Sequence, residues 1–85
     1  MRDAVARAII ARRIDRLAGG NMGDAKSVGG KVTELRIDHG PGYRVYLTRR
    51  GSVLVVLLCG GDKSTQAADI RLAQSMAAKV IDNDS

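Results

Sequence analysis

The chain has 85 residues, of which 14 are Lys or Arg and 9 are Asp or Glu, so its formal net charge is +5. A chain of this length forms one domain with a modest core, because small domains bury a limited share of their surface. The basic balance favours a polyanionic partner such as nucleic acid or an acidic protein, although it also suits a small protein that only has to stay soluble.

Cysteine content and apolar patterning exclude several classes of protein. Cys59 is the only cysteine, which excludes an internal disulfide and a cysteine metal cluster. Because its neighbours are apolar, we expect Cys59 to be a buried side chain and not a reactive thiol. No stretch approaches the roughly 18 apolar residues of a membrane span, and the start of the chain lacks the apolar block of a signal peptide. We therefore expect a cytoplasmic protein with no metal ion, no cofactor and no membrane contact.

The first predicted element is a helix over residues 3–18, with Asp3 as its N-cap and Gly19-Gly20 at its end. Its apolar stripe consists of Ala6, Ile10, Ile14 and Leu17. Val5 and Ile9 lie about a quarter-turn away from that stripe and predict a second packing partner. The glycine-rich residues 19–31 predict a loop.

Three strands are expected next, over residues 32–38, 43–49 and 53–59. In the first two, apolar and polar residues alternate, so that one face is apolar and the other carries Arg36 and Arg44. Gly40-Pro41-Gly42 predicts a tight turn, with Gly42 free to take a positive φ, and therefore antiparallel pairing. The third strand is apolar on both faces, which fits an interior strand better than an edge, although a meander of three strands would leave it at an edge.

An amphipathic helix is predicted over residues 64–81, capped by Ser64 or Thr65. Its apolar stripe consists of Ile70, Leu72, Ala73, Met76, Ala77, Val80 and Ile81. Lys63 then lies at a helix N-terminus, where free N–H groups attract anions. The order of elements predicts a single α+β domain over residues 1–85, in which a three-stranded antiparallel meander is packed by an N-terminal and a C-terminal helix.

Four segments resemble one known family: residues 24–30 (DAKSVGG), 34–37 (ELRI), 40–46 (GPGYRVY) and 60–66 (GGDKSTQ). In combination they resemble the HigB-like addiction module killer branch of the RelE/ParE toxin superfamily, and the first helix is similar to the second helix of that branch. Members usually have a strand and a short helix before the helix that matches the first helix of this chain. We therefore expect this chain to lack those two elements. The unmatched Val5 and Ile9 agree with such a gap, which a partner or a second copy of the chain would fill.

The resemblance implies the toxin of a type II toxin–antitoxin module, a ribosome-dependent endoribonuclease that cuts mRNA and inhibits translation. Its partners would be the ribosome, mRNA and an antitoxin, expected to be of the helix-turn-helix type. Arg36, Arg44 and Lys63 match the basic positions of RelE-type active sites, which need no metal ion. Arg44 and Lys63 are expected on the scissile phosphate, and Arg36 on the phosphate or the leaving oxygen. The chemistry of arginine is consistent with these assignments, because guanidinium groups bind phosphate bidentately.

Other interpretations of these residues remain open. Arg36 and Arg44 would also be explained by pairing with Glu34 and Asp38 across a solvated sheet face. His39 is the candidate general base, since its unperturbed pKa lies near neutrality, but its place beside a turn explains it without chemistry. Four further cations are expected to contact the RNA backbone or merely to keep loops soluble: Lys26, Lys31, Arg49 and Arg50.

Alternative functions also remain. A ParE-like poison of DNA gyrase would share the fold and need no catalytic residues, and a truncated, inactive toxin would only bind antitoxin. A nucleotide P-loop at residues 57–66 is excluded, because Asp62 stands directly before Lys63 where that motif requires glycine. The two tyrosines are too few for an aromatic platform that binds single strands, so any nucleic acid would be held by its phosphates.

Overall fold

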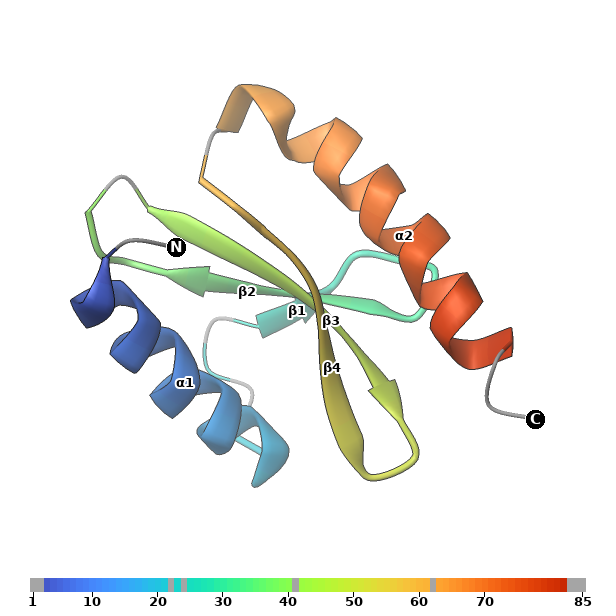
Figure 1. Ribbon diagram of the computed structural model, residues 1–85, viewed down its shortest axis with the longest axis horizontal. Coiled ribbons are helices and arrows are strands. Elements are labelled where there is room, and N and C mark those ends of the chain that lie inside the picture. Colours follow the sequence, from blue (N-terminus) through green and yellow to red (C-terminus); the bar gives the residue numbers. More distant parts are fainter. Residues whose placement is uncertain (1–2, 22, 24, 41, 62, 83–85) are drawn as a thin grey trace.

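The computed structural model describes residues 3–21, 23, 25–40, 42–61 and 63–82. Its elements are α1 (Ala4–Ala18), β1 (Ala25–Ser27), β2 (Val32–Ile37), β3 (Tyr43–Arg50), β4 (Val53–Gly60), the short 3-10 helix η1 (Lys63–Thr65) and α2 (Gln66–Asp82). The strands form one antiparallel sheet in the order β1-β2-β3-β4 (Figure 1). The predicted α+β class, both helices and the three predicted strands are confirmed, with ends that agree to within one or two residues.

The predicted number of strands is wrong, because the described sheet has a fourth strand in addition to the three predicted ones. β1 lies within the segment predicted as a loop and pairs with β2, so that Lys26 lies opposite Glu34. Three residues are too few to show the alternation that identifies a strand in sequence, and glycines surround them. β1 can be identified as a strand only from its pairing with the edge of β2.

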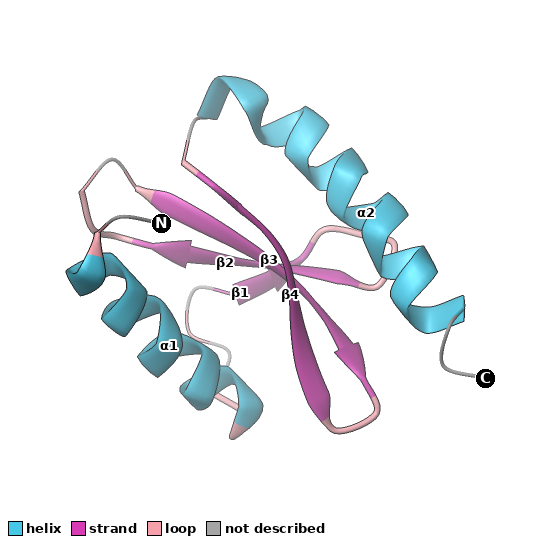
Figure 2. Cartoon of the chain, in the orientation of Figure 1, coloured by secondary structure: helices cyan, strands magenta, loops and turns pink. Residues whose placement is uncertain are grey.

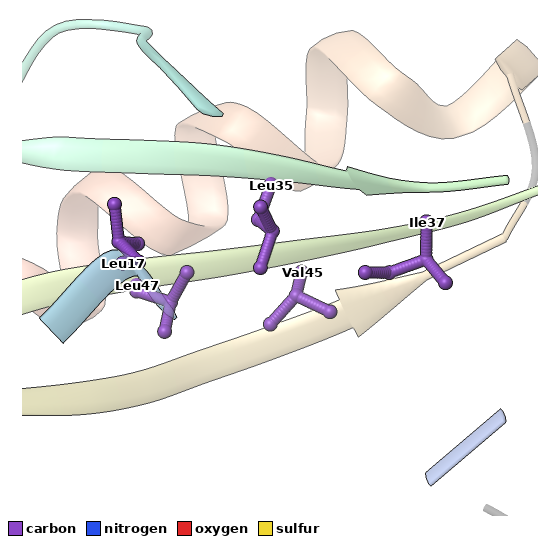
Figure 3. Packing of buried hydrophobic residues seen from close by; sticks show 5 residues of the cluster. All are labelled: Leu17, Leu35, Ile37, Val45 and Leu47. Carbon is purple, nitrogen blue, oxygen red and sulfur yellow. The ribbon is translucent and has the colours of Figure 1, made fainter. Parts of the chain in front are cut away.

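A helix covers each face of the sheet (Figures 1 and 2). On the α1 side, one buried cluster joins Leu17 of α1 to four side chains of β2 and β3: Leu35, Ile37, Val45 and Leu47 (Figure 3). Leu17 lies beside Leu47 at one end of this cluster, and Ile37 lies at the other end. On the α2 side, Ala73 and Ala77 pack on Val32, Tyr46 and Leu57. The predicted apolar face is thus confirmed. The opposite face is not simply solvated, because α2 buries part of it.

The ends of the helices follow local chemistry. The Asp3 carboxylate accepts a hydrogen bond from the Ala6 amide at 3.0 Å, which confirms the predicted N-cap of α1. α2 is entered through η1, and the capping role of Ser64 or Thr65 stays a prediction. The positive φ predicted for Gly42 is found, at 84°, whereas Pro41 of the same turn lies outside the described residues.

Three apolar side chains depart from the predicted pattern. Ile9 packs against the α1-side core, but Val5 is 59% exposed. Leu72, which the helical stripe assigned to the core, is 51% exposed. None of the described helices has the length and hydrophobicity needed to cross a bilayer.

β4 is an edge strand, as the predicted meander requires, although its two apolar faces would suit an interior position better. It is paired with β3 and ends the order of strands in the described sheet. Its outer side leaves Val53 60% and Val56 52% exposed. Cys59 is also exposed, contrary to prediction, because apolar neighbours in sequence do not supply a covering layer. Partial burial nevertheless raises the pKa of its thiol, which disfavours a reactive thiolate.

Candidate active site

The β2–β3 pairing places two arginines side by side. Arg36 and Arg44 are direct partners in the antiparallel register, next to the pair formed by Glu34 and Tyr46. Like charges opposite one another destabilise a pair of strands. Within the described part of the chain, neither arginine is ion-paired with Glu34 or Asp38. The interpretation that they merely pair with those acids is therefore wrong, and the arrangement is typical of a site for an anion.

Lys63, which follows the last strand of the sheet, is the third cation of this group. Gly60 is the β4 residue opposite Arg44, and η1 starts shortly after it with Lys63. A Cβ atom at Gly60 would lie 2.7 Å from Oδ2 of Asp69, so the absence of a side chain lets the first turn of α2 approach the sheet. The close approach of α2 brings Lys63 next to the arginine pair.

The three cations line one cavity of about 520 Å³. Its lining residues are Arg36, Ile37, Asp38, Gly42, Tyr43, Arg44, Gly61 and Lys63. The sequence predicted that Arg36, Arg44 and Lys63 lie together, and the structure places them together. Their individual roles on a scissile phosphate stay predictions. Asp38 and Tyr43 are lining residues that the sequence interpretation did not assign to the site.

His39 does not line this cavity. Its Nε2 atom lies 3.3 Å from Oδ2 of Asp3, so the imidazole connects the β2–β3 turn with the N-cap of α1. The hydrogen bond from the Ala6 amide, together with the His39 contact, lowers the pKa of Asp3. This contact explains His39 structurally, and its role as a general base stays a prediction.

The cations predicted to contact RNA do not line the cavity either. Lys31 precedes β2 and Arg49 and Arg50 end β3, so these three lie at the far end of the hairpin. Arg50 follows Arg44 by six positions in β3, which corresponds to about 20 Å along an extended strand. Lys26 lies between the two ends, with its Nζ atom 3.7 Å from Oε1 of Glu34. The structure therefore separates Lys31, Arg49 and Arg50 from the arginine pair, whereas Lys26 lies beside Glu34, two positions along β2 from Arg36.

A buried polar cluster lies beside the cavity, beneath α2. Glu34 and Tyr46 are both 0% exposed, and Gln66 Nε2 donates a hydrogen bond to Oε2 of Glu34 at 2.9 Å. The Nε atom of Arg44 is buried as well, without a hydrogen-bond partner among the described residues. Alternation placed these side chains on the polar face, but only the packing of α2 shows that they are buried. The Nε end of the Arg44 guanidinium is thus shielded from solvent, although the residue lines the cavity.

Tyr46 makes the stability of the fold sensitive to alkaline pH. Burial, and then the charge of Glu34, raise the pKa of Tyr46 from 10.0 to about 12. The stabilisation by the neutral phenol is complete below pH 10 and is lost as the pH rises through 12. In the wild type, we expect this loss to lower the free energy of unfolding by about 2 kcal/mol by pH 12. Tyr46→Phe should remove the loss. Urea unfolding at pH 9 and again above pH 11 measures it. Tyr43→Phe is the matched control and should keep it. Equal losses in the two variants would contradict the assignment.

One relative establishes the kinship of the chain. The chain is 57% identical over 75 residues to a protein of Haemophilus influenzae named only as uncharacterized. The match covers 88% of this chain and 76% of that protein. No protein-family model matches the chain. No solved structure matches it.

Proposed function

We propose that this chain, which belongs to the same family as the uncharacterized Haemophilus influenzae protein, is the toxin of a type II toxin–antitoxin module. In this proposal it is an endoribonuclease that cuts mRNA on the ribosome. The observation that supports the proposal is the cavity that Arg36, Arg44 and Lys63 line together. Because the four sequence segments resemble HigB-like toxins, we infer that the anion bound in this cavity is a phosphate of RNA.

Cleavage of an RNA diester has three requirements. The ribose 2′-hydroxyl loses a proton, a dianionic phosphorane is stabilised, and the 5′-oxygen gains a proton. Two opposed guanidinium groups and one ammonium meet the second requirement, because they supply positive charge and bidentate donors around one phosphate. Asp38 adds a carboxylate to the cavity wall that can accept a hydrogen bond from a ribose hydroxyl. It is a second candidate for the general base beside His39.

Arg44 is the better preorganised of the two arginines. It is partly buried, with its Nε atom shielded from solvent, whereas Arg36 is exposed. A fixed donor stabilises developing charge without reorganising during the reaction. We therefore assign Arg44 to the phosphorane, together with Lys63, and Arg36 to the phosphate or the leaving oxygen.

The proposed partners fit surfaces outside the cavity. Lys26, Lys31, Arg49 and Arg50 are exposed and provide cations for contacts with ribosomal RNA. A groove of about 250 Å³ between α1 and β4 is lined by Arg7, Ile10, Ala11, Ile14, Val45, Val56 and Cys59. Its mostly apolar lining offers a surface to an antitoxin of the helix-turn-helix type or to a second copy of the chain.

Primer extension on translated mRNA tests the function directly. After induction of the chain, we expect new 5′ ends inside the open reading frame of a reporter. The same reporter without a start codon is the control, and it should remain intact because the reaction needs a translating ribosome. Intact transcripts together with DNA breaks would instead support a gyrase poison. Antitoxin binding with intact RNA and DNA would indicate an inactive toxin.

A further inference from the structure

Three buried polar atoms lie on the α2 face of the sheet without a partner. They are Oε1 of Glu34, Nε of Arg44 and the hydroxyl oxygen of Tyr46, and none of them has a hydrogen-bond partner among the described residues. A buried polar atom that makes no hydrogen bond costs free energy, so such atoms are rare in folded proteins. Three of them on one face of a small sheet require a common explanation.

The register of the sheet places these three side chains next to one another. Tyr46 is the direct partner of Glu34, and Arg44 lies two positions before Tyr46 in β3, so all three share one face. Cβ atoms of direct partners are about 4.5–5.5 Å apart and those of diagonal neighbours about 7–8 Å, which long side chains span. Burial and then the charge of Glu34 raise the pKa of Tyr46, and the charge of Arg44 opposes that rise. Both ions therefore act on the phenol, as the register implies.

The hydrogen-bonding capacities of the three atoms are complementary. Nε of Arg44 only donates, an oxygen of the Glu34 carboxylate only accepts, and a phenol does both. Oε2 of Glu34 already accepts a hydrogen bond from Gln66 Nε2 at 2.9 Å. Nζ of Lys26 lies 3.7 Å from Oε1, which is too far for a hydrogen bond. Oε1 is therefore left for the phenol of Tyr46, and the phenol oxygen is left for Arg44.

We propose that Tyr46 is a positioning residue for Arg44. When the terminal nitrogens of Arg44 bind an anion in the cavity, Nε of Arg44 donates to the phenol oxygen of Tyr46, and the phenol donates to Oε1 of Glu34. Buried, charge-assisted hydrogen bonds strengthen one another, so this chain of bonds holds the guanidinium in one orientation. A guanidinium held in this way loses less freedom when it binds. The inference rests on the proposed function, in which the anion is an RNA phosphate, and adds a residue that acts on it through Arg44.

NMR of the Arg44 side chain tests these hydrogen bonds, with inorganic phosphate as the probe. The Nε–H signal of Arg44 is the one that disappears from the spectrum in the Arg44→Lys variant. In the wild type, we expect phosphate to slow hydrogen exchange of this N–H about tenfold, because a hydrogen bond to a charged group has to open first. In Tyr46→Phe, phosphate should leave the exchange rate nearly unchanged.

Thr48→Val is the matched control for the loss of a buried hydroxyl. Thr48 follows Tyr46 by two positions on the same strand, is 1% exposed, and its Oγ1 donates to the Lys31 carbonyl at 2.8 Å. Its removal affects the far end of the hairpin and not Arg44. We expect Tyr46→Phe to bind inorganic phosphate about tenfold more weakly than the wild type, and Thr48→Val to bind it as the wild type does.

Two results would overturn the role of Tyr46. One is an exchange rate of the wild-type Arg44 N–H that does not respond to phosphate, and this measurement does not depend on the stability of Tyr46→Phe. The other is a folded Tyr46→Phe variant that binds phosphate as the wild type does, or no more weakly than Thr48→Val. Phosphate binding that depends on Tyr46, without mRNA cleavage, would reject only the nuclease function. Cleavage with phosphate binding that is independent of Tyr46 would reject only the positioning role.

Discussion

Replacing Arg44 by alanine is expected to lower the single-turnover rate of mRNA cleavage on programmed ribosomes by about 10²- to 10³-fold. Arg44 lies opposite Arg36 and shares the cavity with Lys63, so its loss removes a fixed donor from the charge that develops on the phosphate. The fold should remain intact, because the buried Nε atom that disappears has no hydrogen-bond partner among the described residues. Cleavage rates and far-ultraviolet circular dichroism of the same preparations give both quantities.

Two control variants make this result specific to Arg44. Arg44→Lys keeps the charge but loses the bidentate fork, so its rate should lie between those of the wild type and Arg44→Ala. Lys79→Ala removes one positive charge from the exposed last turn of α2, away from the cavity at the other end of that helix, and should cleave as the wild type does. A folded Arg44→Ala protein with an unchanged rate would reject the site. An equal loss in Lys79→Ala would show that only net charge matters.

Most of the sheet was predictable because its signals are local. Alternation in β2 and β3 and the glycines between them determine the hairpin, and that hairpin places Arg36 opposite Arg44. β1 was missed because its three residues acquire a strand conformation only by pairing with β2. A segment that depends on a tertiary contact leaves little pattern in its own sequence.

The surroundings of the site were less predictable than its cations. Alternation assigns a side chain to a face, but it does not show which layer covers that face. Glu34 is consequently buried beneath α2 and Cys59 is exposed at an edge, the reverse of what their neighbours in sequence indicated. The contact of His39 with Asp3 joins residues far apart in the sequence. No local pattern reports such a contact.

The largest expected effect on stability comes from Leu47→Ala. Leu47 is 0% exposed in β3 and belongs to the cluster that packs between the sheet and α1 (Figure 3). Truncating a leucine in such a site costs about 2–5 kcal/mol, because apolar burial is lost and a cavity remains. That cost is a large share of the total for a domain of this size, typically about 5–10 kcal/mol. Urea unfolding followed by circular dichroism measures the change.

Leu72→Ala is the matched control, because it makes the same chemical change at a position that is 51% exposed. Its free energy of unfolding should fall by less than about 1 kcal/mol. Equal losses would contradict the burial of Leu47. Leu47 and Arg44 share β3, yet Leu47 does not line the cavity. At a temperature where Leu47→Ala is still folded, each folded molecule should therefore cleave mRNA at the wild-type rate, which separates the stability of the sheet from the chemistry of its arginines.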